Sequence, residues 1–193
     1  PMRHPTSIPA LCLLWGSLSA CNSGGSSSYA GVVLTDLASE SISSFVVDID
    51  SIHLENTQGE LVSVLDGTAR VDLAGLVDLG QVFSDQSVGS GRYAGARLVL
   101  DWTEAEAWLE GEDEAATLLD AAGNPLGGTT TIEISFPGSS FDMPSGSLQP
   151  LQFDVNLNAS ADVFASENTI RLMPTVVLTV KPPAPKLQWV AGG

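Results

Sequence analysis

Residues 45–54, which read FVVDIDSIHL, contain two alternating patterns of apolar and polar side chains that are out of phase. The apolar residues occupy odd positions in the first half and even positions in the second: Phe45, Val47, Ile49, then Ile52 and Leu54. A period of two is typical of a β-strand with one buried face and one wet face. Because a slip of one residue would turn the apolar set toward water, the change of phase predicts a β-bulge or bend at Asp50–Ser51.

The same alternation recurs in stretches that follow. Their apolar residues share one parity within each stretch: Ala96, Leu98, Leu100 and Trp102; Ile132, Ile134 and Phe136; Leu151, Phe153, Val155 and Leu157; Ile170, Leu172, Val176, Leu178 and Val180. Turn signals rich in Gly, Pro and Asn lie between apolar runs, at Asn56–Gly59, Gly123–Pro125 and Pro144–Gly146. Pro174 lacks a backbone N–H, so its strand needs a bulge or an edge position there.

One short segment has a different period. Leu73, Leu76 and Val77 follow Asp72 at helical spacing, which predicts one short helix that Asp72 could cap. About eight or nine short strands with turns between them otherwise predict an all-β fold. We expect an antiparallel β-sandwich with Greek-key connections, with a closed β-barrel as the alternative.

Composition excludes some functions. The 193 residues are 44% apolar and 16% charged, which favours one folded core over intrinsic disorder. Seven Lys and Arg face 23 Asp and Glu, so the net charge is −16. Binding to a phosphate backbone needs clustered basic side chains, so no nucleic-acid partner is expected. Attraction to anionic lipid is disfavoured for the same reason.

The N-terminal stretch has the pattern of a secretory leader. Ile8–Trp15 is an apolar run far shorter than the roughly 20 residues of a spanning helix. Leu18-Ser19-Ala20-Cys21 resembles the bacterial lipobox, in which the cysteine is lipidated and becomes the first residue. Ordinary leader cleavage after Ala20 is disfavoured, because it prefers a small residue where Leu18 stands. Cys21 is therefore the expected lipidation site and membrane anchor.

The expected organisation follows from this anchor. Residues 1–20 are the signal peptide, 21–28 the lipidated cysteine with a Gly/Ser tether, 29–181 the β-sandwich, and 182–193 a Pro-rich linker and tail. Asn22 follows the cysteine, which by resemblance to enterobacterial sorting points to the outer membrane. The expected location is the cell envelope, as an outer-membrane lipoprotein facing the periplasm or the cell surface.

Processing would also remove reactive groups. Cys12 leaves with the leader and Cys21 carries lipid, so the mature chain has no free thiol and no disulfide. His4 leaves as well, so His53 is the one remaining histidine. A Cys/His zinc site and a Cys–His nucleophile pair within one chain are therefore excluded.

Acidic side chains are the weak candidates for a metal site. They form two groups: Asp36, Asp48 and Asp50, and then Glu112, Asp113 and Glu114. Calcium prefers several such oxygens, although a run of charges at a hairpin tip is usually a solvated loop. No cofactor is expected, and calcium is the alternative. Two facing carboxylates would instead suit glycan hydrolysis, which requires a set separation between them.

Aromatic residues are the candidates for ligand contact. Trp108 falls on the polar parity between Glu106 and Glu110, where an exposed ring could stack on a sugar or form an interface. A covering layer would bury the same ring, and the sequence leaves both arrangements open. Trp102 and Tyr93 are the other two candidate contacts.

Short motifs recur in order from Gly31 to Val180. They are Val33–Asp36, Phe45–His53, Val71–Leu73, Gly91–Leu98, Pro144–Gly146, Phe153–Val155 with Ser160, and Arg171–Pro174. Together they resemble an uncharacterised domain-of-unknown-function family of secreted bacterial and archaeal lipoproteins. Ala38 departs from that pattern, since the family commonly has proline there. The family has no assigned activity, so the resemblance implies a fold and a location and no catalytic residue.

The sequence thus predicts a lipoprotein domain that is not an enzyme. Its role would be binding or structural, with an unknown protein or glycan as partner. A carboxylate-based glycan hydrolase is the alternative class. A structural stalk of a larger envelope protein is a third reading.

Overall fold

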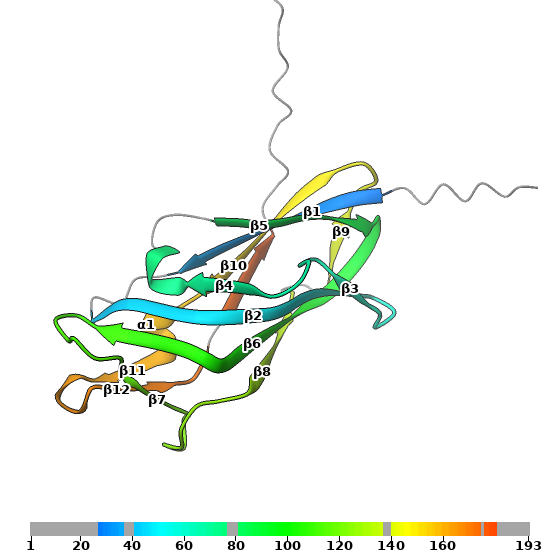
Figure 1. The fold of residues 1–193 in the computed structure, drawn as a ribbon. Helices are drawn as coiled ribbons and strands as arrows, with labels where there is room; N and C mark the ends of the chain where they lie inside the picture. The colour runs from blue at the N-terminus through cyan, green and yellow to red at the C-terminus, as the bar shows by residue number, and fades with distance from the viewer. Residues whose placement is uncertain (1–26, 37–40, 77–80, 137–139, 175, 181–193) are drawn as a thin grey trace, which may run out of the picture.

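The computed structural model describes residues 27–36, 41–76, 81–136, 140–174 and 176–180. Two larger sheets pack face to face and a small third sheet continues them at one end (Figure 1). No sheet of the described residues closes on itself, so the predicted sandwich is confirmed over the closed alternative.

The strands divide among the sheets as follows. One sheet has the order β13 (Val176–Val180), β10 (Leu148–Val155), β1 (Ser27–Asp36), β5 (Gln81–Gly89). The second has the order β3 (Leu61–Ser63), β2 (Ile42–Asn56), β6 (Gly91–Leu109), β8 (Thr129–Ser135), with β4 (Ala69–Asp72) on β2 and β9 (Phe141–Met143) on β6. The third has the order β11 (Ala161–Phe164), β12 (Thr169–Leu172), β7 (Thr117–Leu119). The helical segments are single turns: η1 (Leu73–Leu76), α1 (Leu157–Ser160) and η2 (Ala165–Glu167).

The predicted bulge in β2 is confirmed. Ile49 pairs with Leu100 and Ser51 pairs with Val99, so Asp50 is an extra residue without a partner in β6. Ile49 and Ile52 are both fully buried although they have opposite parity. The bulge therefore lets both halves of β2 point their apolar side chains into the same core.

The core lies between the two larger sheets. Its largest fully buried side chains come from both sheets and, with Leu73, from η1: Phe45, Phe153, Leu34, Ile49, Ile52, Leu54, Leu73, Leu98, Leu100, Met143 and Leu151. Trp102 meets Phe45 edge to face, with ring centroids 6.4 Å apart. Such pairs add to the stabilisation that burial of the rings already supplies.

Two strand pairs depart from the expected antiparallel arrangement. β1 runs parallel to β10, and β7 runs parallel to β12. Parallel neighbours cannot be joined by a tight hairpin, and the paired segments are indeed far apart in the chain. Alternation of apolar residues is the same in both arrangements, so it does not specify the direction of a partner strand.

Three local expectations change in detail. Pro174 is not inside one strand, because it separates β12 from β13, which belong to different sheets. The expected helix is the single 3₁₀ turn η1, which Asp72 directly precedes. The Asp72 carboxylate accepts hydrogen bonds from the Phe45 N–H and the Ser44 hydroxyl of β2, both 2.9 Å. Leu157 lies in α1, beyond the end of β10 at Val155.

Candidate functional site

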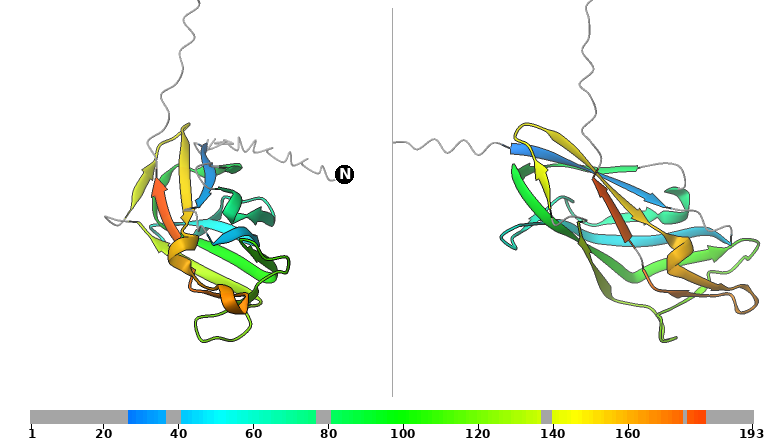
Figure 2. Two further views of the ribbon diagram at one scale, coloured as in Figure 1. Left: turned by 90° about the vertical axis from the view of Figure 1, so that its left-hand side faces the viewer. Right: turned by 180° about the vertical axis from the view of Figure 1, so that it is seen from behind.

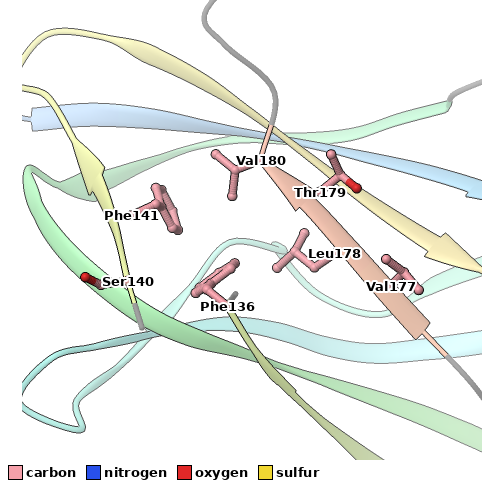
Figure 3. A pocket seen from close by; sticks show the side chains of 7 residues that line it. All are labelled: Phe136, Ser140, Phe141, Val177, Leu178, Thr179 and Val180. Atoms are coloured by element: carbon pink, nitrogen blue, oxygen red, sulfur yellow. The ribbon is translucent and has the colours of Figure 1, made fainter. Parts of the chain in front are cut away.

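An apolar pocket opens between the edges of the two larger sheets. Its volume is about 370 Å³ and side chains from β9, β13 and the end of β8 surround it: Phe136, Ser140, Phe141, Val177, Leu178, Thr179 and Val180 (Figure 3). Concave, mostly apolar pockets with a few polar groups are typical ligand sites. This pocket is therefore the candidate binding site of the domain.

A stack of aromatic rings forms one wall of the pocket. Phe136 and Phe141 meet edge to face at 4.9 Å, and Phe141 stacks on Tyr93 at 5.7 Å. Tyr93 lies behind this wall and its hydroxyl donates a hydrogen bond to the Gly89 carbonyl, 2.7 Å. Burial raises the pKa of the Tyr93 hydroxyl, which keeps it a neutral donor at physiological pH. The rings of Phe136 and Tyr93 thus fix the position of the Phe141 side chain between them.

The opposite wall is an edge strand. β13 pairs with β10 along one side, and in the described part of the chain its other side has no paired strand. Residues 176–180 contain no charged residue and no proline, and Val177 is 52% exposed. Charges and proline are the usual devices that prevent an edge from pairing with another chain. β13 therefore offers backbone hydrogen bonds next to an apolar pocket.

The structure places two of the three predicted aromatic contacts inside the fold. Trp102 is 4% exposed, and its indole N–H donates to the Thr130 hydroxyl, 2.8 Å. Tyr93 is 3% exposed. Neither ring presents a face to solvent, so the prediction of direct ligand contact is wrong for both. Trp102 shares the apolar parity of Leu98 and Leu100, and that parity points into the core.

Trp108 is half-buried on β6, opposite Ser44 of β2. It does not line the apolar pocket. Its partial exposure lies between the exposed and the covered arrangement that the sequence left open.

The predicted acidic groups do not come together. Asp36 ends β1 in one sheet, whereas Asp48 and Asp50 lie on β2 in the other. Asp48 pairs with Arg70 at 3.1 Å, and Asp50 is the exposed extra residue of the bulge. Glu112, Asp113 and Glu114 are exposed in the loop after β6. Within the described ranges, no three His, Cys, Asp or Glu side chains are placed to hold a metal ion.

A smaller polar hollow, which the sequence did not indicate, lies near the start of β6. It measures about 190 Å³, and Glu55 of β2 and Glu133 of β8 line it on either side of Gly95. Glu133 forms an ion pair with Arg97, 2.8 Å. The two glutamates are far apart in the chain, and only the order β2-β6-β8 brings them to one hollow.

Comparisons with known proteins give no information about the candidate site. No family model, curated protein or solved structure matches the chain. Of the helices in the described residues, none has the length and apolar character to cross a membrane. The predicted anchor Cys21, the leader and the tail after residue 181 lie outside the described residues.

Proposed function

We propose that this chain is a non-enzymatic binding domain of the cell envelope, held at the membrane by lipid on Cys21. The Leu18–Cys21 stretch supports the anchor, since it has the order of residues that lipidation requires. The Gly/Ser-rich residues that follow lead directly into β1, which begins at Ser27. A Gly/Ser-rich tether would let the sandwich meet a partner near the bilayer.

The observation that carries the binding role is the apolar pocket beside β13, whose outer edge is unpaired among the described residues. An extended peptide could add to that edge through backbone hydrogen bonds while one apolar side chain enters the pocket. A sugar would need polar groups and an exposed ring, yet Ser140 and Thr179 are the only polar side chains among the seven lining residues. The pocket therefore favours a protein partner over a glycan.

Replacing Cys21 by serine tests the anchor. Because serine cannot form the thioether, the variant should lose both incorporation of radiolabelled palmitate and sedimentation with membranes. Serine in place of Cys12 is the matched control and should leave both properties unchanged, since that residue leaves with the leader. Label on both proteins, or on neither, would contradict the proposal.

A photoreactive residue at Ser140 tests the pocket in intact cells. We expect a crosslinked product of discrete protein mass, which should disappear when Val177→Lys places a charge at the pocket mouth. The same photoreactive residue at the exposed Ser166, which lines neither the apolar pocket nor the polar hollow, is the control. A product that resists protease and yields to glycosidase would instead indicate a glycan.

A carboxylate-based glycan hydrolase is the second candidate. The observation in its favour is that Glu55 and Glu133 line one polar hollow, as a pair of catalytic acids would. Arg97 forms an ion pair with Glu133, 2.8 Å, which holds that carboxylate at the edge of the hollow. Turnover of a glycan that is lost in Glu55→Gln would establish this function and exclude the purely binding role.

A further inference from the structure

Two apolar side chains form an exposed patch on the outer face of the four-stranded sheet. Tyr29 of β1 and Leu148 of β10 are direct partners in the parallel pair, and they are 48% and 53% exposed. Gly31 follows on the same face, where a Cβ atom would lie 3.5 Å from Leu148 Cδ1. We call Tyr29 and Leu148 the Tyr29 patch. It is separate from the apolar pocket, whose lining includes neither residue.

The Tyr29 patch lies where the tether enters the fold. Ser27 is the first residue of β1, and Tyr29 follows two positions later. A fully extended chain from Cys21 to Ser27 spans at most about 22 Å. Lipid on Cys21 would therefore hold this end of the sandwich within a short distance of the bilayer surface.

The three segments that meet around the patch carry no charged side chain, and the exposed ion pair Arg92–Asp142 lies one residue beyond them. Ser27 pairs with Gly89, and the Tyr29 N–H donates to the Ser147 carbonyl, 2.8 Å, so three segments meet at this end. These segments, residues 27–33, 86–91 and 143–151, contain no Asp, Glu, Lys or Arg, in a chain whose net charge is −16. No charge in these three segments would have to lose its water at a lipid surface.

The acidic run lies at the other end of the molecule. Figures 1 and 2 show the start of β1 at one end of the sandwich and the loop after β6 at the other. That loop contains Glu110, Glu112, Asp113 and Glu114, all exposed. Repulsion from anionic headgroups would therefore turn this end away from a membrane.

We propose that the Tyr29 patch is a second membrane contact, which inserts among phospholipid headgroups and stands the sandwich on the end where β1 begins. Tyrosine suits this position, because its ring is apolar and its hydroxyl remains in contact with water. Leu148 supplies the apolar surface beside it. This inference rests on the lipid anchor of the proposed function and adds an orientation to it.

Ser87 of β5 is exposed and pairs with Tyr29 of β1, so a spin label at Ser87 measures the contact directly. The probe is the lipidated full chain on phosphatidylcholine vesicles, with Ser87→Cys or, at the far end, Glu112→Cys as the labelled site. Lipid blocks Cys21, so each variant carries one free thiol. We expect collisions of the Ser87 label with a water-soluble nickel chelate to be roughly threefold fewer than those of the Glu112 label.

Replacing Tyr29 and Leu148 together by serine should remove this protection while the protein still floats with the vesicles. The matched control replaces Phe164 and Met173 by serine, an aromatic and an aliphatic residue that are 38% and 52% exposed elsewhere. The control should keep the protection. Melting curves of both double variants check that each remains folded.

The outcomes separate the inference from the anchor. Equal exposure of the two labels on a protein that floats would overturn the membrane contact and leave the anchor intact. A chain that carries no lipid and does not float would overturn both. Protection in native membranes that is absent on pure vesicles would assign the patch to a protein partner and overturn the lipid contact.

Discussion

Alanine in place of Phe45 should lower the free energy of unfolding by about 3–5 kcal/mol. The ring is completely buried between the sheets and meets Trp102 edge to face. Removing the ring would forfeit the free energy gained when the ring is transferred from water into the core. It would also leave a cavity that the rigid strands on both sides cannot close. Urea unfolding of the domain, followed by tryptophan fluorescence, measures this change.

Phe164 provides the matched control. It is 38% exposed and contacts the Arg171 guanidinium, 5.3 Å from the ring centroid. The same change to alanine there should cost about 1 kcal/mol or less. Equal losses at the two positions would show that the core described here is not the one that stabilises the protein.

Gly95→Ala should be the second strongly destabilising change, by about 1–3 kcal/mol. A Cβ atom at Gly95 would lie 2.8 Å from the carbonyl oxygen of Ile134 in β8, closer than such atoms approach. The obstacle is backbone in a paired strand, so β6 and β8 would have to separate. The change in the free energy of unfolding is again read from denaturant titration.

Gly31→Ala is the control for this change. Gly31 is also a strand glycine, but a Cβ there would make an ordinary contact of 3.5 Å with the end of the Leu148 side chain. The loss should stay below about 1 kcal/mol, and lower chain entropy in the unfolded state favours the alanine. If Gly31→Ala proved the more harmful of the two, the close approach of β6 and β8 would be refuted.

Alternation in the sequence predicted the buried faces of the long strands β2, β6 and β10, but the eight or nine expected strands are thirteen in the described part of the chain, because short strands such as β3, β7 and β9 are too brief to alternate visibly. The change of parity within residues 45–54 identified the bulge at Asp50, because only an extra residue can keep Ile49 and Ile52 on one side. The turn at Asn56–Gly59 was equally local, since Gly59 adopts the left-handed backbone, φ 83°, that glycine tolerates best. Features of this kind depend on neighbours in the chain.

The candidate sites depended on neighbours in space. Asp72 is bound to Ser44 and Phe45, and the pocket joins β13 to β8 and β9, through pairings that no local pattern encodes. The parallel direction of β1 and β10 is likewise invisible to alternation, yet it places Tyr29 beside Leu148. Alternation predicts which face of a strand is buried, because the burial of each side chain depends on its own apolar surface. Which strands meet depends on the packing of the whole chain, and the pocket and the Tyr29 patch exist only through those meetings.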